Sequence, residues 1–218
     1  MNKQTGFTLI ELAIVLVIIG LLLGGVLRGQ ELINSAKVKN MARDFQNVQV
    51  YIYGYQDKFK ALPGDDAAVA NHVTGGTPAA TAAERGNGVI NGTWNTTTDG
   101  AESCVFWQHT RLAGLAPGST TVNCAAGNVY QPRNADGGLV GVQSVSTLTT
   151  ITGMTGAYAI CSDAILGKFA IQLDTTLDDG ETSTGSVRAI TSGTSGAGMT
   201  SANVNLAPSA TYTVCMAI

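Results

Sequence analysis

The hydrophobic pattern begins with one uninterrupted apolar stretch. Residues 7–27 read FTLIELAIVLVIIGLLLGGVL, and Glu11 is the only charged side chain among these 21 positions. A helix of this length is roughly 31 Å long, which matches the hydrocarbon core of a bilayer. The stretch therefore predicts a transmembrane helix.

The apolar residues then become periodic, and recur every three or four positions as on one face of a helix. They are Met41, Phe45, Val48, Ile52, Tyr55 and Phe59. The pattern stops at Leu62-Pro63-Gly64, where proline and glycine terminate a helix. We predict one helix over residues 7–60, with its first half in lipid or a filament core and its second half packed on a globular domain. A coiled-coil dimer is the alternative, although the heptads last for under three repeats.

Residues 61–218 show short β-prone segments separated by Gly, Thr, Ser, Ala and Asn. The candidate strands are residues 138–145, 146–151, 157–161, 169–173, 186–190 and 212–218. Residues 102–115 favour a short helix instead, with inward-facing Val105, Phe106, Leu112 and Leu115 and with Gly114 near its end. An antiparallel sheet packed on the long helix would bury the apolar stripe, so the predicted fold class is α+β.

Composition and charge narrow the function. Of the 218 residues, 44% are hydrophobic and only 12% are charged, against about 25% charged in a typical soluble domain. Residues 1–60 hold seven basic and four acidic side chains, while the rest hold five basic and eleven acidic ones. The net charge of -3 offers no basic surface for phosphate backbones, which disfavours nucleic acid as a partner.

Glu11 is the residue of the apolar stretch that requires an explanation. A carboxylate inside a membrane helix costs several kcal/mol unless it is neutralised or paired, so it indicates function by default. A protonated Glu, or one that snorkels to the interface, is the structural alternative. A secretory signal peptide fits poorly, because the apolar run is long and no small-x-small cleavage site follows it directly. A lipoprotein anchor is excluded, because no Cys lies near the run.

The string Gly6-Phe7-Thr8-Leu9-Ile10-Glu11, after a short polar leader with one Lys, closely resembles the class III signal of type IV pilins and type II secretion pseudopilins. The resemblance implies that prepilin peptidase removes residues 1–6, cutting after Gly6, and that Phe7 becomes the methylated N-terminus. It also implies that Glu11 pairs with the amino group of Phe7 in a neighbouring subunit, which would neutralise both charges at low dielectric.

This resemblance implies a structural subunit of a type IV pilus or pilus-like filament with the pilin fold. Its partners would be other pilin subunits, prepilin peptidase and methyltransferase, and the inner-membrane assembly machinery. The protein would lie in the bacterial inner membrane before assembly, and then in an extracellular fimbrium or a periplasmic pseudopilus. Leu62-Pro63-Gly64-Asp65 and residues 107–115 also look like features of large prepilin-type proteins. A minor pseudopilin of type II secretion is one alternative, and an adhesin or enzyme tethered by a single helix is another.

Four cysteines lie in the predicted head, and an even count in an oxidising compartment favours two disulfides with three connectivities open. We favour Cys104–Cys124, which closes a loop around Pro117-Gly118, and Cys161–Cys215, which ties the C-terminal strand to the sheet. Zinc is disfavoured, because the sequence has no Cys-x-x-Cys spacing and its histidines, His72 and His109, are isolated.

Two further groups carry candidate chemistry. Asp174, Asp178, Asp179 and Glu181 are calcium candidates, but they do not match an EF-hand loop, and a solvated turn at Asp179-Gly180 is the favoured interpretation. His109 has no assigned acid or nucleophile partner, which favours a structural role. The sequence contains no nucleophile elbow, metalloprotease motif or phosphate loop. We therefore expect no catalytic activity and no cofactor other than, at most, calcium.

Overall fold

The computed structural model describes residues 9–125 and 130–218. It divides into two compact units, Met1–Lys37 and Val38–Ile218, and the boundary falls within the long helix α1 (Leu9–Phe59). Over its described length α1 agrees with the helix predicted for residues 7–60. It forms because this stretch contains no proline, is rich in leucine, and carries apolar residues at helical spacing in its second half.

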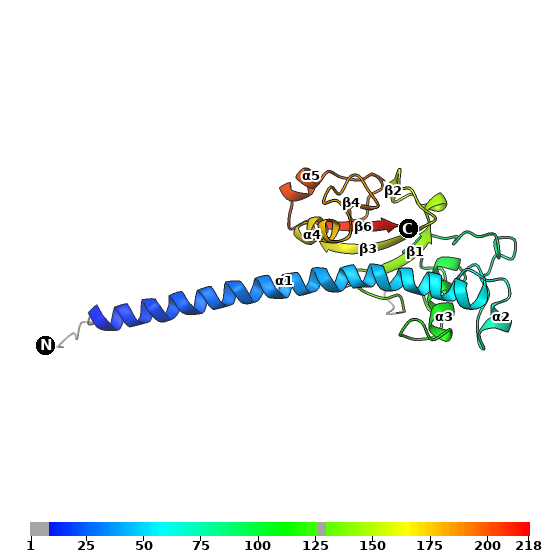
Figure 1. The fold of residues 1–218 in the computed structure, drawn as a ribbon, viewed down its shortest axis with the longest axis horizontal. Helices are drawn as coiled ribbons and strands as arrows, with labels where there is room; N and C mark the ends of the chain where they lie inside the picture. Colours follow the sequence, from blue (N-terminus) through cyan, green and yellow to red (C-terminus); the bar gives the residue numbers. More distant parts are fainter. Residues whose placement is uncertain (1–8, 126–129) are drawn as a thin grey trace. The chain divides into compact units, whose positions relative to one another are not determined.

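The second unit contains a four-stranded antiparallel sheet, which confirms the predicted α+β class (Figure 1). The strand order is β1-β3-β6-β4, with bounds Val140–Ser144, Tyr158–Leu166, Thr211–Ala217 and Val187–Thr191 respectively. A separate parallel pair joins β2 (Ile151–Thr152) to β5 (Gly196–Ala197). The central strands β3 and β6 each have a hydrogen-bonded neighbour on both sides, and the edge strand β1 is buried at all five of its positions.

The C-terminal part of α1 packs on this sheet through the predicted apolar stripe. Its buried residues are Val38, Met41, Ala42, Phe45, Val48, Ile52 and Tyr55. Most of them share one core cluster with Val142 of β1, Ile160 of β3 and Val214 of β6. Phe59 is only half-buried and stacks on the ring of His72 at 5.2 Å. Burying a large apolar side chain such as Phe45 or Ile52 stabilises a fold by about 1.5–3 kcal/mol. The buried residues of this stripe therefore hold the helix on the head.

Helix α3 (Glu102–Leu112) confirms the helix expected over residues 102–115, although it ends earlier. Val105 and Phe106 are buried as expected, whereas Leu112 and Leu115 are only half-buried. Gly114 follows the end of the helix with a φ of 77°, a left-handed conformation that glycine adopts without a steric penalty. The remaining helices are α2 (Val69–His72), α4 (Gly167–Leu177), α5 (Ser201–Leu206) and the 3-10 turn η1 (Val145–Thr147).

Two strand predictions are wrong. Residues 169–173 belong to α4, where Phe169, Ala170, Leu173 and Asp174 are buried at helical spacing. The alternation of Phe169, Ile171 and Leu173 mimics a strand, but Ile171 is only half-buried. Residues 146–151 form η1 and a turn, and only Ile151 enters β2. There β1 ends at Ser144, whose backbone carbonyl accepts a hydrogen bond from the Thr147 hydroxyl at 3.0 Å, and the chain turns away from the sheet.

Candidate functional site

The apolar half of α1 is exposed along its described length. The large apolar side chains from Leu9 to Ile33 are between 47% and 88% exposed. An 18-residue window of this helix has a mean hydropathy of 2.8, and none of it is buried within the chain. The helix is therefore long and apolar enough to cross a membrane. Because exposed apolar surface costs about 25 cal/mol per Å² in water, this half requires lipid or another protein around it.

Four glycines interrupt this apolar surface at Gly20, Gly24, Gly25 and Gly29. A Cβ atom added to any of them would meet no atom within 4 Å, so packing inside the chain does not require glycine at these positions. They form two pairs four residues apart, and small residues at this spacing let membrane helices approach closely. The arrangement suits contact with a second helix.

Glu11 lies in the first described turn of α1, within the exposed apolar surface. Its neighbours Leu9, Ile10 and Leu12 are all more than half exposed. Gly6 and Phe7, at which the sequence predicts cleavage and methylation, lie outside the described residues. The predicted pairing of Glu11 with an N-terminal amino group therefore remains an expectation.

Both disulfides form with the pairing that the sequence favours. Cys161 on β3 and Cys215 on β6 are directly opposite in the antiparallel register, with Cα atoms 4.0 Å apart. Cys104 on α3 joins Cys124 in the following loop, with Cα atoms 6.2 Å apart. Asp99 lies beside the Cys104–Cys124 disulfide, and its carboxylate accepts a hydrogen bond from the Cys124 amide. Because both sulfurs are oxidised, this group offers a metal no thiolate.

Each of the four calcium candidates accepts a hydrogen bond from a backbone amide. Asp178 Oδ2 accepts hydrogen bonds from the amides of Ser186 and Val187, and Glu181 Oε1 accepts one from Ser201. Asp174 Oδ1 accepts the Gly180 amide at 2.6 Å. Within the described residues these four carboxylates are not gathered closely enough for three of them to share one ion. The turn is thus organised by carboxylate to amide hydrogen bonds.

A layer of buried carboxylates near the C-terminal end of α1 was not singled out as a site by the sequence analysis. Asp65, which is 3% exposed, accepts hydrogen bonds from the amides of Gly86, Asn87 and Gly88. The neighbouring Asp66 accepts one from the Tyr55 hydroxyl at 2.7 Å, and its Oδ2 lies 2.6 Å from His72 Nδ1. In the sequence, the signal for this layer is the pair of acids directly after Pro63-Gly64. Their hydrogen bonds connect the end of α1 to the loops around it.

His109 lies in the same layer, and its contacts support the structural role expected for it. The Gly64 amide donates to Nδ1 at 3.0 Å, and Nε2 donates to the Thr77 carbonyl at 2.8 Å. Burial lowers the pKa of His109, so the ring stays neutral in this tautomer. With both nitrogens engaged and the side chain fully buried, His109 cannot reach a substrate.

One family model matches part of the chain. Residues 1–27 match the model of the prokaryotic N-terminal methylation motif. The chain therefore carries the type IV pilin and pseudopilin signal. No curated protein and no solved structure matches the chain.

The pilin signal explains the exposed half of α1. In pilins and pseudopilins such a helix anchors the protein in the membrane before assembly and then packs among other subunits. The head described above, with an antiparallel sheet packed on the second half of the same helix, has a pilin-like architecture. Assembly with other pilin-type subunits and processing by a prepilin peptidase follow from the motif at this general level.

Proposed function

We propose that this protein is a structural subunit of a type IV pilus. Prepilin peptidase cleaves it after Gly6, Phe7 is methylated, and the mature chain polymerises through the first half of α1. The observation that carries the proposal is the exposed apolar first half of α1, interrupted by one carboxylate at Glu11, within a matched methylation motif.

Electrostatics gives Glu11 its role in this proposal. A carboxylate surrounded by lipid or packed helices is strongly destabilised unless a cation neutralises it. The methylated amino group of Phe7 in a neighbouring subunit supplies such a cation at the same depth. One ion pair per subunit then fixes the axial register of the filament, while the glycine pairs allow the helices to approach closely.

The head favours a pilus over the main pseudopilin of type II secretion, because residues 61–218 are many for a subunit of that kind. Two disulfides stabilise it, as suits a domain carried outside the cell. A minor pseudopilin at the tip of the secretion filament is the alternative in the same class. A structural role is also consistent with the buried and fully engaged His109.

Replacing Glu11 by Ala tests the proposal. We expect filaments on the cell surface to fall at least tenfold, because the cation of the neighbouring subunit loses its partner. The protein should remain membrane-inserted, and mass spectrometry should still find a methylated Phe7 at its N-terminus. Electron microscopy of filaments and fractionation of membranes give the two measurements.

Glu31→Ala is the matched control, because Glu31 is an exposed carboxylate on the same helix beyond the apolar stretch. It should leave filament number unchanged. Normal filaments from Glu11→Ala would remove the role assigned to Glu11, and an intact Met1 would contradict processing. A deletion strain that keeps its pili but no longer secretes proteins would identify a pseudopilin instead.

A further inference from the structure

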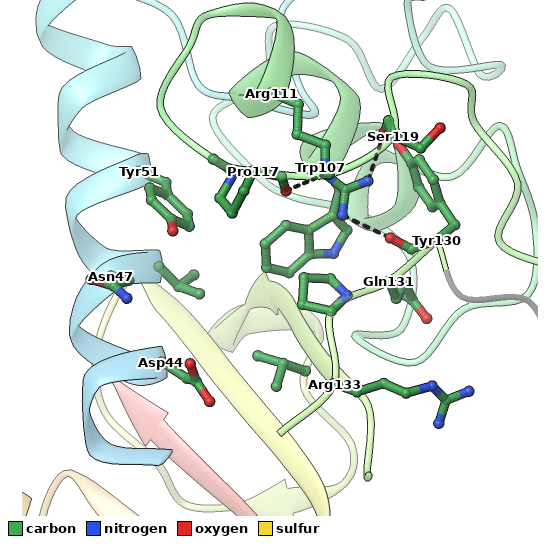
Figure 2. A pocket seen from close by; sticks show the side chains of 15 residues that line it. Asp44, Asn47, Tyr51, Trp107, Arg111, Pro117, Ser119, Tyr130, Gln131 and Arg133 are labelled. Carbon is green, nitrogen blue, oxygen red and sulfur yellow. Dashed lines mark hydrogen bonds between the residues drawn. The ribbon is translucent and has the colours of Figure 1, made fainter. Parts of the chain in front are cut away.

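A pocket of about 520 Å³ lies in the head between α1, α3 and the loops around residues 116–119 and 130–133. Asp44, Asn47 and Tyr51 line one side, at positions on α1 that are three and four residues apart and therefore share a helix face. Trp107 and Pro117 line the opposite side. Figure 2 shows Asp44 and Tyr51 directed from the helix toward this space. The volume is in the range of sites for small ligands.

The opposite wall is held rigid by Arg111. Its guanidinium donates hydrogen bonds to the carbonyls of Pro117, Ser119 and Tyr130 at 3.0, 2.9 and 2.7 Å. It also lies over the rings of Trp107 and Tyr130, at 5.7 and 4.7 Å from their centroids. The arginine thus joins two loops to α3 and is already engaged by oxygen acceptors on all three of its nitrogens.

The pocket's second cation is turned away from it. Arg133 donates to the Gly137 carbonyl at 2.7 Å, and Figure 2 shows its guanidinium extending away from Asp44. Both arginines of the lining thus donate to backbone carbonyls, and neither forms an ion pair with Asp44.

Asp44 is a charged group of the pocket whose negative charge has no cationic partner among the described residues. Its carboxylate is half-buried, and within the described residues no hydrogen bond or ion pair engages it. Burial raises the pKa of Asp44 to about 6, the direction expected for a carboxylate that loses water without gaining a cation. Burial also raises the pKa of Tyr51, with a further increase from the negative charge of Asp44 and an opposing decrease from Arg111.

We propose that this pocket binds a primary ammonium group on a short apolar stem, with the ammonium on Asp44 and the stem against Tyr51, Trp107 and Pro117. The ammonium supplies the opposite charge that Asp44 lacks, and the stem covers apolar surface of the pocket. A neutral ligand would leave the carboxylate desolvated and unpaired, which costs free energy. The proposal is independent of the pilus function. The ammonium comes either from a small amine or from a lysine side chain of another copy of this chain.

Titration of the full chain in detergent with n-butylammonium tests the site. The chain has two tryptophans, and only Trp107 lines the pocket. We expect a saturable shift of the Trp107 indole NMR signal and none of Trp94. The uncharged analogue n-pentanol should bind at least tenfold more weakly, because it cannot pair with Asp44.

Asp44→Asn keeps the size of the side chain and should weaken n-butylammonium at least tenfold. Asp57→Asn is the matched control, because Asp57 is an exposed carboxylate on the same helix and should leave binding unchanged. Circular dichroism establishes that both variants fold. The absence of a saturable shift with the unmodified chain, or equal binding by Asp44→Asn, would overturn the proposal.

Carbodiimide coupling distinguishes the two sources of the ammonium, since it links a carboxylate to an adjacent amine as an amide with loss of water. In assembled filaments, a peptide that joins Asp44 to a lysine of another copy identifies the lysine side chain. If butylammonium binds but no such peptide forms, the ligand is a small amine. The titration does not require filaments, so its result is separable from the pilus proposal.

Discussion

At the scale of single residues, the head stabilises most of its buried carboxylates with backbone amides. Asp65 accepts three amides from one loop, and Asp66 binds the Tyr55 hydroxyl and the Ala68 amide. Glu102 differs, because only Oε2 is engaged, by the amide and side chain of Asn91. Among the described residues its Oε1 is buried without a hydrogen-bond partner. When Glu102 is ionised, one of its carboxylate oxygens is therefore buried without a hydrogen bond, which costs free energy.

Ionisation of Glu102 should destabilise the head as pH rises. Burial raises its pKa from 4.5 to about 7, so the folded chain keeps a proton there that the unfolded chain releases. The contribution is fully present below pH 4.5 and is lost by about pH 7. Glu102→Gln removes this ionisation, and we expect it to raise the free energy of unfolding at pH 8 by about 1–3 kcal/mol relative to the wild type.

Urea unfolding between pH 4 and 8 measures the effect in the full chain. The difference between Glu102→Gln and wild type should grow across the window, because Glu102 ionises only in the wild type. Asp44 and Asp174, whose pKa values burial also raises to about 6, titrate in both proteins and cancel in the difference. The exposed Glu31→Gln should show no such change. A difference that is constant with pH would contradict the assignment to Glu102.

At the scale of elements, the two disulfides close loops of different length. Cys161–Cys215 spans 54 residues and Cys104–Cys124 spans 20. The loss of unfolded-state entropy predicts about 4 and about 3 kcal/mol respectively. Replacing Cys161 and Cys215 by Ala should therefore destabilise the head more than replacing the other pair. Thermal unfolding of both double variants, with the oxidised wild type as reference, checks the order, and the reverse order would contradict the entropic account.

The elements also differ in how well their own sequence determines them. The helix over α1 and the strand at β6 are predictable, because long periodic or β-branched segments have one favourable structure. Helix α4 is not predictable in this way. Phe169, Ile171 and Leu173 alternate as in a strand, and only the packing of α4 against the sheet and helix α5 buries Ala170 and Asp174 as well. The Asp44 pocket is unpredictable for a related reason. Its walls come from segments more than 50 residues apart, and only the folded chain brings them together.

At the scale of the whole molecule, one helix serves two environments. The motif and Glu11 can be recognised in the sequence because they are a continuous string at residues 6–11, and the apolar half of α1 follows from composition. Within the head, the same helix has a buried face with Met41 and Ile52 and an exposed one with Val50 and Tyr53, which are 62% and 48% exposed. The buried face thus stabilises the head, and we expect the exposed face to be available for contacts in the proposed filament.

Two substitutions on α1 separate these roles. Ile52→Ala leaves a cavity against the sheet, since Ile52 is fully buried in the core cluster, and should lower the free energy of unfolding by about 2–5 kcal/mol. Val50→Ala, two positions away on the exposed face, should change it by less than about 0.5 kcal/mol. Urea unfolding followed by the fluorescence of Trp94 and Trp107, both in the head, measures the two values. Under the proposed pilus function, Val50→Ala should reduce filament number although its subunit is stable. Equal destabilisation by both variants would mean that the buried stripe does not hold the head on the helix.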